Sequence, residues 1–375
     1  MSYSIVQVQN SKEIMQFIKM PWKIYKNDPN WVPPLIGDMK RSLLPGPKCV
    51  LSEIPHTMFL LYKNSEIAGR IFAGIDTRMN KIKGTNAGYI SLFECINDYD
   101  AAKMLFDGAC GWLKAKGMTY VRGPVSMTGG DGDENKGLLV EGFDRPPVVM
   151  NSYNPPYYAD LFEKYGFVKD YDLYAYYLDK DLIFRKNPEK IIEYAKKKYG
   201  FKVESIDFTK LDREINDIKK VLDVSIPDEW PDLVPPSLEE VKEMALKLKP
   251  LADPDLVIIA RSGDEPVGFG LAIPDYNQVL KKLNGRLTPL SVLKFLVYKR
   301  KINMARVFTM FVVPEYRTKG VSYAIYYQIF LNGTKKGYHY GEGSTIGETN
   351  TRMRKDIESF GGIKYKTYRV YGLNL

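Results

Sequence analysis

Apolar and polar positions along the chain predict two strand–turn–strand hairpins that share one pattern. The first hairpin is expected over residues 59–73 and the second over residues 256–272, each with a polar turn between two apolar runs. Each is followed by a predicted strand, a helix with apolar positions three and four apart, and a further strand. These elements are expected at residues 88–95, 99–116 and 119–121 in the first half, and at residues 306–313, 321–336 and 338–341 in the second.

Two short motifs recur in the same order, which indicates that the chain contains one fold twice. Glu66 and Gly69 correspond to Glu265 and Gly268 at an offset of 199 residues. A later segment recurs at an offset of 196, and in each copy an Asn is expected to begin a helix that a Gly ends. The matched positions are Asn154, Tyr157, Asp160, Leu161, Gly166 and Phe167 with Asn350, Met353, Asp356, Ile357, Gly362 and Ile363. We therefore predict an α/β protein with two tandem domains, residues 1–185 and 186–375.

Composition excludes several classes of protein. A chain of 375 residues with 45% hydrophobic residues is long enough for two folded domains, each with its own core. Three scattered cysteines and two histidines give no zinc or disulfide spacing, so no metal cofactor is expected. The first residues lack a signal-peptide pattern, which favours a cytoplasmic protein. The most apolar run, residues 290–298, is short and interrupted by Lys294, so neither a membrane span nor a membrane partner is expected.

The stretch most informative about function is residues 312–322, where a strand is expected to lead through a tight turn into a helix. Pro314 has no N–H group and therefore ends strand pairing. Residues 317–322 are then expected to present successive backbone N–H groups at a helix N-terminus, an arrangement that binds phosphate. Gly320 leaves room for a ligand to approach the backbone.

This stretch resembles the acyl-CoA-binding signature of the GCN5-related N-acetyltransferase (GNAT) superfamily, Arg/Gln-x-x-Gly-x-Gly/Ala, which stands here as Arg317, Gly320 and Ser322. Ser322 departs from the signature, but it is small, and its hydroxyl is expected to help cap the helix. The order of the predicted elements and the segment 350–362 resemble the family as well. The resemblance covers most of the chain as two tandem GNAT-like domains with mixed, largely antiparallel central sheets.

The resemblance implies an acyl-CoA site in the second domain. The backbone of Met310 and Val312 would hold the pantetheine arm, and Asn350 would contact it from the other side or serve only as a helix N-cap, two roles that can coexist. The net charge of +9 suits the phosphates of CoA, whereas the interspersed acids make a nucleic-acid partner unlikely. Replacing Gly320 by Glu is expected to abolish CoA binding without unfolding the protein. The residues expected to hold the pyrophosphate are Arg317, Thr318, Lys319, Gly320, Val321 and Ser322.

The first half departs from the family at the corresponding turn. It has no Gly-rich segment there, and it presents Asp98 and Asp100, whose charges would repel phosphate. We predict that the N-terminal domain is a degenerate copy that forms the acceptor side and no longer binds CoA.

Direct transfer to an amine requires a base, because an amine with a pKa of about 10.4 is almost entirely protonated at pH 7. Many family members place a Glu early on the fourth strand, but Arg306 stands at that position and cannot serve. The candidate bases are Glu342 and Glu348, and the alternative for each is a solvated loop carboxylate. The family often has a Tyr that donates a proton at the position where Ile357 stands here. The candidate acid is Tyr365 on the last strand, and the alternatives are Tyr368 on the same strand and Glu358.

The sequence therefore predicts an acyl-CoA-dependent N-acyltransferase, with acetyl-CoA as the expected donor and a small-molecule amine or a peptide as the acceptor. The Gly-rich segment 123–135 is either an acceptor-binding loop or an ordinary surface loop. Two alternatives stay open. One is a Fem-like aminoacyl transferase that uses charged tRNA, and the other is a non-catalytic acyl-CoA-binding module. The sequence leaves the oligomeric state open.

Overall fold

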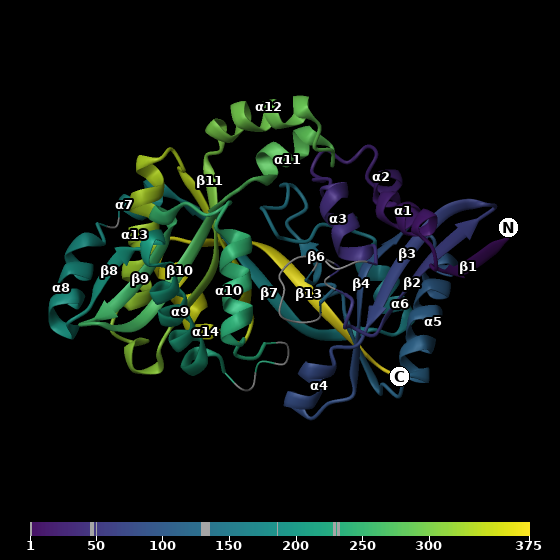
Figure 1. Cartoon of the computed structure of the whole chain (residues 1–375), viewed down its shortest axis with the longest axis horizontal. Coiled ribbons are helices and arrows are strands. Elements are labelled where there is room, and N and C mark those ends of the chain that lie inside the picture. The colour runs from purple at the N-terminus through teal and green to yellow at the C-terminus, as the bar shows by residue number, and fades with distance from the viewer. Residues whose placement is uncertain are drawn as a thin grey trace. The chain divides into compact units, whose positions relative to one another are not determined.

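The computed structural model describes residues 2–45, 49, 51–128, 136–185, 187–227, 230 and 233–375 (Figure 1). The chain forms two compact units. Unit 1 contains Met1–Leu173, Asn277–Arg300 and Lys366–Leu375, and unit 2 contains Tyr174–Tyr276 and Lys301–Tyr365.

Unit 1 is built on a mixed sheet in which strands β1 to β5 follow one another in order. The β1–β2, β2–β3 and β3–β4 pairs are antiparallel, whereas β4 and β5 are parallel and are connected by helix α5. Its strands are β1 (Tyr3–Gln7), β2 (His56–Lys63), β3 (Glu66–Gly74), β4 (Ala87–Cys95), β5 (Tyr120–Gly123) and β6 (Leu138–Glu141). Its helices are α1 (Ser11–Lys19), α2 (Pro21–Ile24), α3 (Ile36–Leu43), α4 (Thr77–Lys83), α5 (Tyr99–Ala115), α6 (Tyr158–Tyr165), α11 (Asn277–Leu283) and α12 (Pro289–Tyr298).

Unit 2 repeats this plan with the sheet order β7-β12-β11-β10-β9-β8. Here β11 and β12 are the parallel pair, and helix α13 connects them. Its strands are β8 (Lys202–Ser205), β9 (Val257–Ser262), β10 (Glu265–Pro274), β11 (Met304–Val312) and β12 (Tyr340–Gly347). Its helices are α7 (Lys180–Arg185), α8 (Glu189–Tyr199), α9 (Leu211–Ser225), α10 (Leu238–Leu248), α13 (Val321–Lys335) and α14 (Thr351–Phe360), with a 3₁₀ turn at Pro314–Tyr316. The predicted α/β class and the repeated hairpin–strand–helix–strand order are confirmed.

Two long strands divide between the units. The second part of β7 (Val168–Asp179), from Tyr174 onward, belongs to unit 2, and the last part of β13 (Ile363–Asn374), from Lys366 onward, belongs to unit 1. In unit 1, Tyr371–Asn374 of β13 pair antiparallel with Tyr120–Gly123 of β5. Each half of the sequence thus supplies a strand to the unit that the other half forms. The division at residue 185 stays a prediction for the domains. The compact units depart from it through these strands, through helix α7, which belongs to unit 2, and through the segment Asn277–Arg300, which belongs to unit 1.

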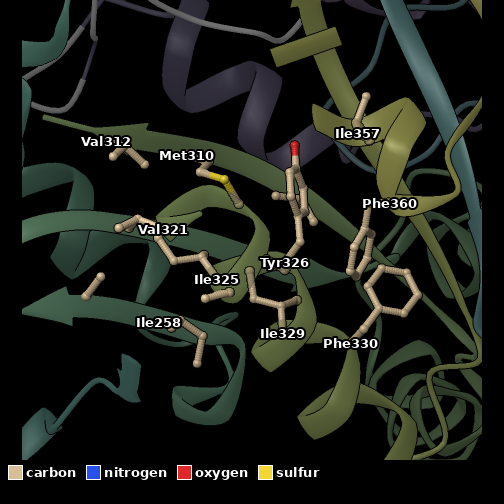
Figure 2. Close-up of a cluster of buried hydrophobic side chains, with 14 of the residues drawn as sticks. Ile258, Met310, Val312, Val321, Ile325, Tyr326, Ile329, Phe330, Ile357 and Phe360 are labelled. Atoms are coloured by element: carbon tan, nitrogen blue, oxygen red, sulfur yellow. The ribbon is translucent and has the colours of Figure 1, made fainter. Parts of the chain in front are cut away.

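The core of unit 2 lies between its sheet and α13 (Figure 2). Ile258 and Ala260 of β9 belong to this core, whereas Val257 and Ile259 belong to the cluster that α9 and α10 cover. This alternation follows from the two-residue period of a strand, which turns successive side chains to opposite faces. The α13 side of the core contains Val321, Ile325 and Ile329 together with Phe360 of α14.

One expected helix start is wrong. Asn154 does not begin a helix, because α6 starts only at Tyr158. Its side chain instead accepts a hydrogen bond from the Leu139 amide (2.6 Å) and donates one to the Leu139 carbonyl (3.1 Å). The two prolines that follow explain the difference, because a residue before proline is disfavoured in the helical region. At the start of α10, Ser237 and Glu240 form a capping box, in which each side chain accepts a hydrogen bond from the backbone of the other.

Candidate active site

The parallel strands β11 and β12 pair only over their first residues. The register runs from Met304 opposite Tyr340 to Val307 opposite Gly343, and β11 then continues to Val312. The pairing of β11 with β10 shifts at the same place, since Leu271 faces Thr309 and Ala272 faces Val307. This β-bulge at Phe308 bends β11 where its parallel pairing with β12 ends.

Four polar side chains meet beside this point: Arg306, Glu342, Ser344 and Tyr365, which we call the Glu342 group. Arg306 and Glu342 are fully buried and lie opposite each other on the two strands. The Ser344 hydroxyl donates to one Glu342 carboxylate oxygen (2.5 Å) and accepts from Arg306 Nε (3.0 Å). The Tyr365 hydroxyl donates to the other oxygen of the same carboxylate.

The charges of this group balance inside the protein. A carboxylate withdrawn from water is unfavourable unless hydrogen bonds and an opposite charge replace the lost hydration. Ser344 links Glu342 to the guanidinium of Arg306, which also donates from Nη2 to the Ser344 carbonyl (3.1 Å). The arrangement fixes the Glu342 carboxylate with one oxygen directed at Tyr365.

Tyr365 is the half-buried member of the Glu342 group. Its ring lies edge-on to Tyr177, with centroids 6.0 Å apart, and Tyr177 stacks on Tyr340 at 5.8 Å. Such contacts restrict the ring, so the hydroxyl is held in one orientation. A phenol placed in this way can pass a proton between a bound molecule and the buried carboxylate.

The sequence named Glu342 and Tyr365 as separate candidates, and the structure brings them into one hydrogen-bonded pair. Glu348 follows β12, and its backbone carbonyl accepts a hydrogen bond from Arg354 (2.9 Å). Sequence reasoning missed the parts played by Arg306 and Ser344. The available signal was the two-residue spacing of Glu342 and Ser344, which places both on one face of a strand.

The turn from β11 into α13 has the geometry expected of an anion site. The first intrahelical hydrogen bond runs from the Ala324 amide to the Gly320 carbonyl (3.0 Å), so the amides of Val321–Tyr323 precede the helical pattern. Helix termini of this kind favour a negative ligand. Gly320 has φ of +79°, and a Cβ there would lie 3.2 Å from the Ala195 Cβ. Glu at this position would strain the backbone, so Gly320→Glu does not test binding alone, contrary to the sequence-based expectation.

The polar side chains of the turn hold the turn itself. Arg317 donates to the Ser225 carbonyl (2.8 Å) and to the Val312 carbonyl (3.2 Å). The Ser322 hydroxyl donates to the Asp356 carboxylate (2.7 Å) and does not cap α13, which corrects the expected capping role. Burial raises the pKa of Asp356, and the hydrogen bond from Ser322 only partly offsets this effect.

Met310, Val312, Thr318, Lys319 and Asn350 are the other residues that the sequence predicts to contact CoA. These contacts stay predictions. The side chains of Met310 and Val312 point into the core, so only their backbones are available to a ligand (Figure 2). Thr318 is exposed, and the Lys319 ammonium lies over the Tyr316 ring, 4.2 Å from its centroid. The Asn350 side chain caps α14 by accepting from the Met353 amide (3.2 Å).

In unit 1 the helix that corresponds to α13 is α5, and the carboxylate of Asp98 lies at the N-terminus of this helix. The Asp98 carboxylate accepts hydrogen bonds from the amides of Asp100 (3.1 Å) and Ala101 (3.2 Å). Lys63 and Tyr3 donate to its other oxygen at 2.6 and 2.5 Å. This carboxylate takes the amides that a phosphate would need, which supports the prediction of a degenerate N-terminal copy.

Asp98 gives unit 1 an acid-sensitive contact. Burial alone would raise the pKa of Asp98, but the hydrogen bonds from Lys63 and Tyr3 lower it from 3.8 to about 2. Because the folded pKa is depressed, the stabilisation is present above pH 3.8 and is lost as the pH falls through 2. After allowance for solvent screening, we expect the Asp98 contacts to contribute about 1–2 kcal/mol to the free energy of unfolding. Urea unfolding of Asp98→Asn, which keeps a capping side chain, should show this loss at pH 7 and a smaller one near pH 3. Asp100→Asn, at an exposed position in the same turn, is the control, and an equal effect of both variants would refute the assignment.

Three further expectations concern a metal site, a membrane span and the acceptor loop. In the part of the chain that the structure describes, no group of three or more His, Cys, Asp or Glu side chains could hold a metal ion. Whether the protein uses a metal is not decided by this, and metal independence stays a prediction. No helix among the described residues is long and apolar enough to cross a membrane. Residues 129–135 of the candidate acceptor loop lie outside the described residues.

Comparisons with known proteins agree with this architecture. The chain is 30% identical over 374 residues to Protein YghO of Escherichia coli K12, which covers 96% of this chain and 93% of that protein. It is 28% identical over 375 residues to the bacterial ceramide synthase of Caulobacter vibrioides, covering 98% of this chain and 96% of that protein. A solved structure of a tandem GNAT protein from the clavulanic acid biosynthesis pathway superposes with a TM-score of 0.55 at 11% identity, covering 100% of this chain and 98% of that one. No protein-family model matches the chain.

The fold and these relationships define the class of protein. The chain has the fold of tandem GNAT proteins, and it belongs to the same family as Protein YghO.

Proposed function

We propose that the protein transfers an acyl group from acyl-CoA to an amine, with Tyr365 as the catalytic residue. The observation that carries this proposal is the hydrogen bond from the Tyr365 hydroxyl to the buried Glu342 carboxylate, beside the end of β11–β12 pairing. Glu342 accepts the proton through Tyr365, and Arg306 and Ser344 are positioning residues that hold the carboxylate in place.

The reaction explains why such a pair is needed. An amine with a pKa of about 10.4 is neutral in roughly one molecule in 2,500 at pH 7, which adds about 4.6 kcal/mol to the barrier. The neutral nitrogen forms a bond to the thioester carbonyl carbon, and the carbon–sulfur bond breaks. The proton that leaves the nitrogen passes to the Tyr365–Glu342 pair and returns to the thiolate of CoA. The products are an amide and the free CoA thiol.

The turn from β11 into α13 is proposed to bind the CoA pyrophosphate. The amides of Val321–Tyr323 and the positive end of the α13 dipole would face the phosphate groups. The guanidinium of Arg317 stabilises the turn by donating hydrogen bonds to two backbone carbonyls. Lys319 would supply the positive charge next to the ligand.

Two acyl donors follow from different observations. The GNAT resemblance favours acetyl-CoA, as the sequence predicts. The relative named bacterial ceramide synthase favours a second candidate, because a ceramide is an amide of a fatty acid and a long-chain amine. In that case the protein would transfer a long acyl chain from acyl-CoA to a lipid amine. The chemistry at nitrogen and sulfur is the same for both donors.

Titration and turnover together test the proposed function. Calorimetric titration with acetyl-CoA and palmitoyl-CoA is expected to show saturable binding of at least one donor. Thr318→Glu should weaken this binding by about tenfold or more, since it adds a negative charge beside the phosphate site at an exposed position. Thr318→Gln introduces a side chain of the same size as Glu but without its charge. It is the matched control and should bind acyl-CoA as the wild type does.

The same protein is then mixed with each donor and a panel of amines that includes glucosamine, a Lys-containing peptide and sphinganine. Release of the CoA thiol only when an amine is present, with the amide identified by mass spectrometry, would establish N-acyl transfer and its donor. Binding without thiol release from any pair would favour a non-catalytic module. Failure of both donors to bind would contradict the proposed function.

A further inference from the structure

Helix α12 exposes an unusual concentration of apolar side chains. None of its residues is buried, and Leu290, Leu293 and Val297 are 62%, 60% and 54% exposed. Val292 and Leu296 are each 48% exposed. Scattered exposed apolar residues are ordinary on protein surfaces, but a contiguous group indicates an interaction site.

These residues form one side of α12, which carries its label in Figure 1. With 3.6 residues per turn, positions 290, 292, 293, 296 and 297 fall within an arc of about 160°. Ser291, Phe295 and Tyr298, which are half-buried, occupy the opposite side. The helix is therefore held to unit 1 by one side and presents a continuous apolar strip, about 10 Å long, on the other.

The chain segment that carries this strip is basic. The segment Asn277–Arg300, which covers α11 and α12, contains six Lys and Arg residues and no Asp or Glu. Lys294, Lys299 and Arg300 lie within or directly after α12, and all three are exposed. An apolar strip with basic residues beside it is complementary to a bilayer surface that carries anionic headgroups.

Charge also argues against a second copy of the chain as the occupant. Two copies that met through this strip would bring their basic residues together without acidic partners in the segment. Binding to an anionic bilayer is instead stabilised by about 1 kcal/mol for each Lys or Arg near its surface, and the apolar side chains are removed from water at the same time. With ten residues, α12 is far shorter than the roughly 20 needed to span a membrane, so it would lie along the surface.

We propose that α12 docks the protein on the surface of a bilayer that contains anionic phospholipids, with Leu290, Leu293 and Val297 inserted between the headgroups. This docking does not depend on the proposed acyl transfer. It replaces the sequence-based expectation that the protein has no membrane partner. That expectation followed from the length of the apolar run, which bears on spanning a membrane and not on lying at its surface.

Vesicle sedimentation tests the docking. The full chain is incubated with vesicles of phosphatidylcholine and phosphatidylglycerol at 7:3, and with vesicles of phosphatidylcholine alone. We expect binding to the anionic vesicles that weakens by about tenfold or more at 0.5 M salt, because screening removes the attraction to the basic residues. The triple variant Leu290→Ser/Leu293→Ser/Val297→Ser should bind at least about tenfold more weakly.

A matched control separates loss of docking from a general loss of surface hydrophobicity. Ile191→Ser removes an apolar side chain of α8 that is 67% exposed, and it should bind vesicles as the wild type does. Circular dichroism of every variant checks that the fold is retained. Wild-type protein that stays in solution with anionic vesicles would overturn the proposal. So would equal binding by the triple variant, or a dimer in light scattering that the triple variant abolishes.

Discussion

Tyr365→Phe is expected to lower kcat for acyl transfer by about 10²- to 10⁴-fold, the range over which a positioned acid or base contributes. The change removes one oxygen atom, which donates to the buried Glu342 carboxylate. The phenylalanine ring keeps the contact with Tyr177, so the fold and the binding of acyl-CoA should change little. Steady-state kinetics with the donor and amine found by the turnover screen measure the effect.

Two controls make this prediction specific. Tyr340→Phe removes a hydroxyl from the same aromatic group without a described contact to Glu342, and it should leave kcat close to the wild-type value. Glu342→Gln should lower kcat as well and change its pH profile, because the amide cannot accept the proton. An unchanged kcat in Tyr365→Phe, with acyl transfer intact, would remove Tyr365 from the reaction without affecting the assignment of the fold.

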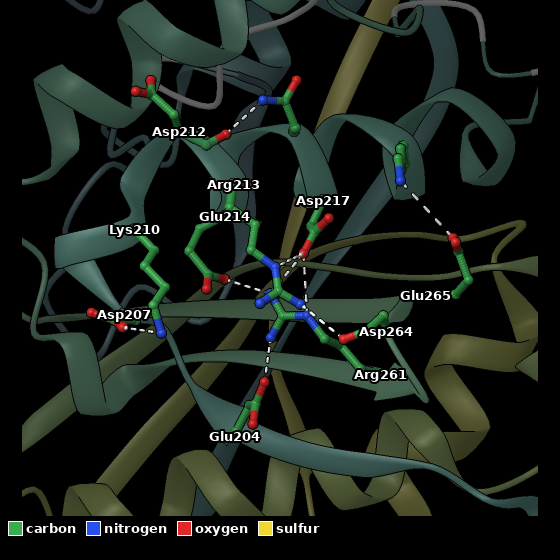
Figure 3. A network of polar contacts seen from close by, with 12 residues as sticks. Glu204, Asp207, Lys210, Asp212, Arg213, Glu214, Asp217, Arg261, Asp264 and Glu265 are labelled. Atoms are coloured by element: carbon green, nitrogen blue, oxygen red, sulfur yellow. Dashed lines mark hydrogen bonds and ion pairs between the residues drawn. The ribbon is translucent and has the colours of Figure 1, made fainter.

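Arg261→Met is expected to lower the free energy of unfolding by about 3–5 kcal/mol, the cost of breaking a buried ion pair by removing one partner. Arg261 lies on β9 and is 6% exposed (Figure 3). Its guanidinium bonds to Glu214 (2.7 Å) and to Asp217 (2.7 and 3.1 Å), both of which are buried on α9, and also to Glu204 on β8. Although burial acts to lower the pKa of Arg261, these carboxylates raise it above its ordinary value. Methionine would leave the buried Glu214 carboxylate without this cation, and it would leave Asp217 only the more distant Arg213.

Urea unfolding at pH 7 provides the measurement, and the neighbouring arginine gives the control. Arg213 on α9 pairs with Asp264, whose side chain is 99% exposed, and with Asp217 at 3.8 Å. Arg213→Met should therefore cost less than about 1 kcal/mol. The triple variant Arg261→Met/Glu214→Leu/Asp217→Leu should recover much of the lost stability, because it removes the unpaired charges together with the cation. Similar losses in the two single variants would mean that Arg261 does not hold α9 on the sheet.

The site was only partly predictable from the sequence. The turn at residues 317–322 follows from a local pattern of proline, glycine and helix periodicity, and the structure has that turn. Glu342 and Tyr365 were recognisable as candidates by residue type, but 23 positions separate them, and no local signal shows that they share a hydrogen bond. Arg306 was considered only as an unsuitable base. Its part as the charge partner of Glu342 depends on the register of two parallel strands, which helix α13 connects.

The sequence by itself determined the repeated hairpins, the helices between the strands and the α/β class, because alternation, capping residues and turn residues act over a few positions. Tertiary structure decided which strands exchange between the units. The residue patterns of β7 and β13 predict strands, but they do not specify the strands with which these two pair. Tertiary structure also decided that Asn154 binds a strand backbone instead of capping a helix. The apolar run of α12 shows the difference most clearly. Its hydrophobicity was visible in the sequence, whereas its exposure depends on how much of the fold covers it, which no run of residues encodes alone.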